Sequence, residues 1–284
     1  MNRLRKLIRG AGIHPRKSLG QSFLEDEGVI HQIVQAAHID PGDTVIEIGA
    51  GVGLMTEAVS HRAERVVAVE IDPTLVRVLD MRLGDRRNIE ILAGDILRCD
   101  LEGLAARLDL RRPFKVLGNI PYHISSPILF KVLDDRTRIA SMCLMLQKEV
   151  ADRLLAPSGT REYGILSVLM DMYTEMERKF DVPPECFFPR PRVWSTVVTF
   201  RMRGDAKYPM RNPEALRPIV KCAFAHRRKT LFNNLRQAGW LNFSPETLRQ
   251  RLLDGGIDPR RRAETLDTQE YARITDILTM KNCA

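Results

Sequence analysis

The sequence has no long hydrophobic run and no closely spaced pair of cysteines. None of its apolar stretches approaches the roughly 20 residues that a membrane-spanning helix needs, so we expect no membrane partner. The absence of any C-x-x-C pair argues against structural zinc and against a disulfide framework, and it fits a reducing cytoplasm. The five cysteines stand far apart, at Cys99, Cys143, Cys186, Cys222 and Cys283.

Acidic residues are missing from the first 20 positions, which hold six lysines and arginines. Residues 205–284 hold fifteen lysines and arginines against nine acids, so the net charge of +8 is concentrated at the two ends of the chain. This segregation indicates a phosphate-rich partner, because a merely solvated surface would scatter its charges. No apolar segment or cleavage site follows the basic N-terminus, so we expect no secretory signal.

From Gly28 to about Phe200, short β-branched apolar runs alternate with segments of helical periodicity. This alternation predicts parallel strands joined by helical crossovers, hence an open α/β sheet that binds ligands at the carboxyl ends of its strands. Beyond residue 204 the strand signals stop, and we place a domain boundary there, between an α/β domain (1–204) and a basic helical domain (205–284). Strands are predicted at 44–49, 65–72, 89–95, 114–119, 141–147 and 195–202, and helices at 28–37, 54–63 and 73–83.

The stretch "EIGAGVG" leaves the first predicted strand with glycines at 49, 51 and 53. A dinucleotide fingerprint would need its third glycine at 54, where Leu54 stands, so this is not a nicotinamide-cofactor signature. Glycines here let the backbone approach a ligand closely. Glu47 just before them suits a cofactor that carries positive charge better than one that carries two phosphates.

Acidic or amide side chains also end the next three strands. Glu70 stands nineteen residues after Gly51, where an acid can accept the two hydroxyls of a ribose. Asp95 is positioned to bond an adenine amino group, and Asn119 follows at the fourth strand end. Each acid alone is more often a helix cap, but four consecutive strand ends of this kind together indicate S-adenosylmethionine as the cofactor.

The fourth strand continues into "NIPY", which in isolation reads as an ordinary turn. In a methyl-transfer site, the Asn119 amide oxygen and the Ile120 carbonyl before Pro121 could accept the two hydrogens of an exocyclic amine. The nitrogen lone pair would then be free to attack a sulfonium methyl group, with orientation supplying most of the rate. Tyr122 offers a flat surface on which a base stacks.

These motifs resemble those of the bacterial dimethyladenosine transferases of the KsgA type, over nearly the whole chain. The resemblance rests on "KSLGQSFL" (17–24), "EIGAGVGLMT", "EID" (70–72), "GDIL" (94–97), "GNIPYHISSPIL", "FFPRPRVWST" (187–196) and "HRRKTLFNNL" (226–235). It implies a seven-stranded Rossmann-like class I methyltransferase core in the first domain and an RNA- and ribosome-binding role for the helical one. The implied reaction is S-adenosylmethionine-dependent dimethylation of N6 of two adjacent adenosines near the 3′ end of small-subunit (16S) ribosomal RNA. The implied partners are that RNA and the small-subunit precursor, with the enzyme a monomer.

Site residues follow from the same resemblance. Phe187, rather than Phe188, falls on the second aromatic position over the target adenine, and Ser22 replaces the family's usual asparagine, which leaves its contact to the cofactor open. The implied catalytic residues are Asn119, Pro121, Tyr122 and Phe187, and the implied cofactor-binding residues are Ser22, Leu24, Gly49, Gly51, Glu70, Asp95 and Asn119.

The segment "FAHRRKTL" (224–231) reads either as a solvated helix face or as an RNA-backbone contact through Arg227, Arg228 and Lys229, and we favour the second. The histidines at 14, 31, 123 and 226 show no metal-ligand spacing. Three alternative functions remain open: a large-subunit adenine dimethyltransferase of the macrolide-resistance type, a DNA adenine or protein glutamine methyltransferase, and a ribosome assembly factor that acts mainly by binding.

Overall fold

A computed structural model describes residues 3–110 and 112–279 of the chain. These form two compact units. The first comprises Met1–Ala151 and Met176–Met202, and the second comprises Asp152–Glu175 and Arg203–Ala284. The chain passes from the first unit to the second for the last time between residues 202 and 203, close to the boundary predicted between residues 204 and 205. The linear division of the sequence nevertheless differs from the structure, because residues 152–175 belong to the second unit.

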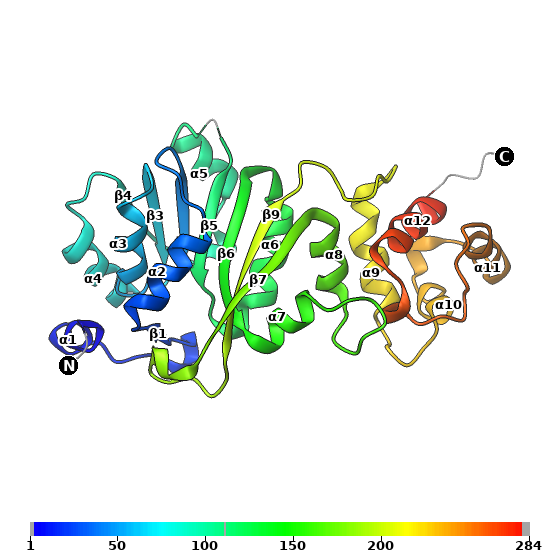
Figure 1. Ribbon diagram of the computed structural model, residues 1–284. Coiled ribbons are helices and arrows are strands. Elements are labelled where there is room, and N and C mark those ends of the chain that lie inside the picture. Colours follow the sequence, from blue (N-terminus) through cyan, green and yellow to red (C-terminus); the bar gives the residue numbers. More distant parts are fainter. Residues whose placement is uncertain (1–2, 111, 280–284) are drawn as a thin grey trace. The chain divides into compact units, whose positions relative to one another are not determined.

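The first unit is built on a seven-stranded sheet with strand order β4-β3-β2-β5-β6-β9-β7 (Figure 1). The pairs β4–β3, β3–β2, β2–β5 and β5–β6 are parallel, whereas β6 and β9 are antiparallel. This confirms the predicted α/β class and places four carboxyl strand ends along one edge. In chain order the strands are β2 (Thr44–Ile48), β3 (Arg65–Glu70), β4 (Ile89–Ala93), β5 (Phe114–Asn119), β6 (Ile139–Gln147), β7 (Thr174–Val182) and β9 (Ser195–Met202).

Aspartate side chains cap the N-termini of α2 and α4, two of the helices of this unit. Asp26 accepts a hydrogen bond from the Val29 N–H, and Asp72 accepts one from the Thr74 N–H, so each satisfies a free donor of the first turn. Apolar residues of α2 and α3 pack with sheet residues such as Val45 in one buried cluster. The helices are α1 (Arg3–Gly10), α2 (Glu27–Ala36), α3 (Leu54–Ser60), α4 (Pro73–Leu83), α5 (Leu101–Arg107) and α6 (Ser125–Asp134), with α7 (Lys148–Leu154) running into the second unit.

Three strands escape the sequence patterns. Strand β7, "TEMERKFDV", is largely polar with several exposed residues, because it lies at an edge of the sheet. Strands β1 (Phe23–Leu24) and β8 (Phe187–Phe188) have two residues each, too few for any periodicity to show. They pair with each other in an antiparallel ladder, which ties residues far apart in the chain.

The second unit is helical, as predicted, and residues 203–279 beyond the end of β9 contain no strand. Helix α12 packs against α8, α9 and α11. Tyr271 lies fully buried at the centre, its hydroxyl donating to the Ala263 carbonyl at 2.8 Å and its ring stacked on Phe224. No helix of the described residues is long and apolar enough to cross a membrane. The helices are α8 (Ile165–Tyr173), α9 (Leu216–Ala223), α10 (Leu231–Leu235), α11 (Pro245–Asp254) and α12 (Thr268–Thr279).

Candidate active site

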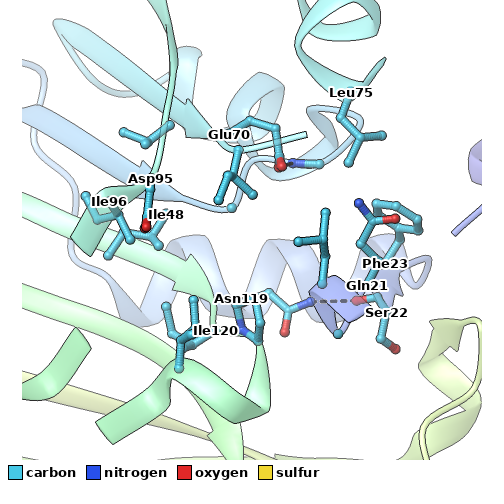
Figure 2. Close-up of a pocket in the computed structure, with 18 of the residues that line it drawn as sticks. Gln21, Ser22, Phe23, Ile48, Glu70, Leu75, Asp95, Ile96, Asn119 and Ile120 are labelled. Atoms are coloured by element: carbon cyan, nitrogen blue, oxygen red, sulfur yellow. Dashed lines mark hydrogen bonds between the residues drawn. The ribbon is translucent and has the colours of Figure 1, made fainter. Parts of the chain in front are cut away.

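A cavity opens where β2, β3, β4 and β5 end, which is the edge at which open α/β sheets bind their ligands (Figure 2). The four strand ends predicted to form a site therefore do meet. Among the described residues, no cluster of three or more His, Cys, Asp or Glu side chains could hold a metal ion. The predicted residues that line the cavity are Ser22, Gly49, Gly51, Glu70, Asp95, Asn119, Pro121 and Tyr122.

The turn after β2 needs glycine for both conformation and space. Gly49 and Gly51 have φ values of +72° and +60°, a region that side chains rarely adopt. A Cβ atom on Gly51 would also stand 3.1 Å from the Phe23 ring. This turn brings bare backbone to the wall of the cavity, so a ligand can approach it closely.

The Glu70 carboxylate is held by the backbone on both oxygens. Its Oε2 accepts the Gly51 N–H at 2.8 Å and its Oε1 accepts the Asp72 N–H at 2.9 Å. The residue is only 5% exposed, and burial raises the pKa of its carboxyl group despite these bonds. The carboxylate is thus fixed in orientation, with remaining lone pairs available to hydroxyl donors of a ligand.

Glu47 is buried beside the glycine turn without a full set of partners. It is 1% exposed, and no donor of the described residues bonds its buried Oε2. Burial raises the pKa of its carboxyl group to about 8. Glu47 lines a second cavity that shares Gly49, Gly51 and Asn119 with the first. An unpartnered buried carboxyl group at this place fits a cofactor that carries positive charge, as S-adenosylmethionine does on its sulfonium and ammonium groups.

The Asn119 amide is oriented by a segment almost a hundred residues earlier. Its Nδ2 donates to the Ser22 carbonyl at 2.9 Å, the dashed line in Figure 2. Since a backbone carbonyl only accepts, the amide nitrogen must face it, and the Oδ1 is left as the acceptor on the other side. This contact orients the amide so that its oxygen, the predicted acceptor, is the atom not used by the Ser22 carbonyl.

Ser22 and Tyr122 are both anchored within the protein. The Ser22 hydroxyl donates to the Pro189 carbonyl at 2.8 Å. The serine that replaces the family's usual asparagine thus bonds a neighbouring loop of the protein in this structure. The Tyr122 hydroxyl lies 3.1 Å from the Ser195 hydroxyl, and burial raises the pKa of Tyr122. With its hydroxyl tethered, the Tyr122 ring forms a fixed part of the cavity wall.

Two predicted site residues lie outside the main cavity. Phe187 is 2% exposed and packs in a buried cluster with Leu24, so the structure does not bring it over a base as predicted. Leu24 lines the second cavity instead. The reason is the antiparallel pairing of β1 with β8, which sets Leu24 opposite Phe187 and turns both into the core. Phe188 is half-buried, with the Arg5 guanidinium 5.0 Å from its ring centre.

Sequence reasoning missed Asp72 and the residues that it holds. Its carboxylate accepts from Gln21 Nε2 at 2.9 Å and lies 3.5 Å from Arg16 Nε. Burial alone would raise the pKa of Asp72, but the hydrogen bonds from Gln21 and Thr74 outweigh it and lower that pKa. Asp72 thereby links the N-terminal segment to Glu70. The sequence does carry a signal for the first of these contacts, because an aspartate before Pro73 predicts the cap of a helix. It carries none for the contact with Gln21.

The predicted RNA contact in the second unit is not a helix. Helix α9 ends at Ala223 and α10 begins at Leu231, so residues 224–230 form the connecting turn, and the helical interpretation is wrong. Arg227 Nη2 donates to the carbonyls of Arg161 and Tyr163, at 2.5 and 3.3 Å, which gives it a structural task inside this unit. No acid of the described residues pairs with exposed Arg228 or Lys229.

The strand order, the cavity at the carboxyl strand ends and the family match together define a class I methyltransferase that uses S-adenosylmethionine. Residues 13–280 match the family model "Ribosomal RNA adenine dimethylase". The chain is 43% identical over 279 residues to the "Ribosomal RNA small subunit methyltransferase A" of Syntrophus aciditrophicus, covering 98% of this chain and 99% of that one. The chain belongs to the ribosomal RNA adenine dimethylase family.

Solved structures agree on the fold. A dimethyladenosine transferase from Plasmodium falciparum superposes with a TM-score of 0.73 at 24% identity, covering 89% of this chain and 95% of that one. The 23S rRNA methyltransferase ErmE superposes with a TM-score of 0.67 at 26% identity, covering 91% and 100%. The expected family and fold are thereby confirmed, and the enzyme class with them.

Proposed function

We propose that this protein transfers two methyl groups from S-adenosylmethionine to N6 of each of two adjacent adenosines near the 3′ end of small-subunit ribosomal RNA. The observation that carries the proposal is the Asn119 amide, whose nitrogen is fixed on the Ser22 carbonyl so that its oxygen serves as an acceptor at the cavity. The small subunit is favoured over the large one because identity to the small-subunit enzyme is 43%, against 26% to the 23S enzyme ErmE.

The proposed chemistry needs two acceptors and no strong base. Asn119 Oδ1 is one acceptor. The Ile120 carbonyl is the other, since no N–H or O–H group of the described residues bonds it. Two such acceptors engage both hydrogens of an exocyclic amine and favour a pyramidal nitrogen with an available lone pair. S-adenosylmethionine supplies an electrophilic methyl group, and positioning supplies much of the rate.

The cofactor is assigned to residues that the strand ends bring together. The glycine turn at 49–51 would allow close approach, Glu70 would accept ribose hydroxyls, and Asp95 would bond the adenine amino group. Glu47 would complement positive charge from the second cavity. Tyr122 would support the target base from the cavity wall.

The second unit is assigned to the ribosomal RNA through Arg228 and Lys229, which are exposed and unpaired with any described acid. Cations of this kind bind phosphates without reading sequence. We place the reaction in the cytoplasm, where the protein would act as a monomer on the small-subunit precursor.

The Asn119→Ala variant tests this proposal by primer extension on small-subunit RNA, because dimethylated adenine blocks reverse transcription. We expect the wild type to produce two adjacent stops and the variant to lose them, with a rate roughly a hundredfold lower. Asn88→Ala is a matched control, since the Asn88 amide also bonds a backbone carbonyl, that of Ser60 at 2.7 Å, but lies outside the cavity. Stops on large-subunit RNA instead would refute the assignment of substrate.

The same variant separates catalysis from assembly. If the Asn119→Ala protein binds immature small subunits as the wild type does, binding and methyl transfer are separable activities of one protein. If both fail together while the variant stays folded, Asn119 contributes to RNA binding, and the acceptor role proposed for it is incomplete.

A further inference from the structure

Trp194 is an exposed aromatic residue at the edge of the sheet where the cavity opens. It is 50% exposed, and its neighbour Val193 is 42% exposed, although large apolar side chains are usually buried. Trp194 directly precedes β9, whose first residue, Ser195, pairs with the last residue of β6, Gln147. Because β6 and β9 are antiparallel, the start of β9 lies at the carboxyl edge of the neighbouring parallel strands.

The backbone at Trp194 is fixed relative to the cavity by two hydrogen bonds. The Lys148 N–H donates to the Trp194 carbonyl at 2.9 Å, and the Ser195 hydroxyl lies 3.1 Å from the Tyr122 hydroxyl. Strands β5, β6 and β9 are consecutive neighbours, so the start of β9 lies about 10 Å from the end of β5 at Asn119. Trp194 thus stands outside the cavity, within reach of a nucleotide adjacent to one whose base is inside it.

The charge beside Trp194 suits nucleic acid. Arg192 is exposed, and no acid of the described residues pairs with it. An aromatic face next to an uncompensated cation is the combination by which proteins bind single-stranded nucleic acid, the ring stacking on a base and the cation binding the backbone.

We propose that Trp194 is a stacking platform for a base of the ribosomal RNA strand next to the target adenosine, with Arg192 on the neighbouring phosphate. This inference rests on the proposed function, because it takes the RNA to be the occupant of this edge. It adds a contact that holds the strand while the target base is in the cavity. Tyr122 acts on the target base, whereas Trp194 acts on its neighbour.

The chain contains two tryptophans, so Trp240→Phe leaves Trp194 as the sole tryptophan reporter of fluorescence. Transcripts of the 3′ domain of small-subunit RNA are titrated into this variant, and methyl transfer to the same RNA is measured in parallel. We expect saturable quenching of Trp194 emission. In the same background, Trp194→Leu should bind the transcript roughly five- to hundredfold more weakly, Trp194→Phe should retain most of the affinity, and the salt slope should stay unchanged.

Met81→Leu is the control for a conservative change at an exposed apolar residue, since Met81 is 75% exposed on α4, away from the cavity lining. If the RNA is methylated but neither quenches Trp194 nor binds Trp194→Leu more weakly, the proposed contact is overturned while the proposed function stands. If the wild type neither binds nor methylates the transcript, the proposed substrate fails and the Trp194 assignment fails with it.

Discussion

The cavity at the strand ends and the basic turn of the second unit handle charge in opposite ways. In the cavity, Glu70 is 5% exposed and bonded by backbone N–H groups on both oxygens. In the turn, Arg228 and Lys229 are exposed and pair with no described acid. A buried, pre-bonded acid recognises a ligand through short-range hydrogen bonds, whereas exposed cations attract phosphates at long range and are screened by salt. The first arrangement suits a small cofactor and the second a polyanion.

Phe187→Ala is expected to have the largest effect. It tests whether Phe187 is a core residue or an aromatic of the site that stacks on the target adenine. Because the side chain is buried in the core, truncation should lower the free energy of unfolding by about 3–5 kcal/mol in urea titrations. Half-buried Phe188→Ala is the control and should cost less. An unchanged stability together with accumulation of monomethyladenosine, read by mass spectrometry of digested RNA, would instead restore Phe187 as the second stacking aromatic.

Glu47→Gln tests whether the buried carboxyl group is destabilising when ionised. The folded pKa of about 8 exceeds the unfolded value of 4.5, so between these pH values the unfolded state holds fewer protons and wild-type stability falls as pH rises. A glutamine side chain cannot ionise, so the variant should lack this fall and gain about 4 kcal/mol over wild type at pH 8, relative to pH 4.5. The measurement is urea unfolding without cofactor at both pH values. Parallel pH profiles for the two proteins would contradict the assignment.

Glu70→Ala tests directly whether the buried carboxylate binds the cofactor through short-range hydrogen bonds. The variant removes the acceptor for ribose hydroxyls and leaves the Gly51 and Asp72 N–H groups unbonded, so cofactor affinity should fall by about 1–3 kcal/mol in calorimetric titration. Glu90→Ala, whose carboxylate pairs with Arg107 away from the cavity, is the control and should bind normally. Unchanged affinity in Glu70→Ala would remove this residue from the site.

The smallest effect is expected from changes to the exposed cations of the basic turn, which attract RNA phosphates at long range. Changing Arg228 and Lys229 together to Ala should reduce the slope of log affinity for RNA against log salt by about 1 to 2, with cofactor affinity unchanged. Arg227→Ala should behave differently and cost stability, about 1 kcal/mol, because its guanidinium bonds two carbonyls within the unit. A double variant with the wild-type salt slope would show that the turn does not meet the RNA.

Much of the site could be predicted from the sequence, for a reason that lies in parallel sheets. Runs such as "TVIEI" and "RVVAVE" are recognisable strands, and parallel strands must place their carboxyl ends along one edge. Gly49, Glu70, Asp95 and Asn119 therefore had to meet once the strands were neighbours. The residue types at these four positions already limited the class of ligand that the site could bind. The division of the chain was less predictable, because residues 152–175 join the second unit through packing that no local pattern records.

What only the tertiary structure decided are contacts between segments remote in the chain. Pairing of Leu24 with Phe187 turns that phenylalanine into the core, the Ser22 carbonyl selects the orientation of the Asn119 amide, and Asp72 meets Gln21. Each depends on the register of a short segment that has no periodicity of its own. A one-residue shift in a two-residue strand would send the opposite side chain inward, and only packing of the whole unit fixes that choice.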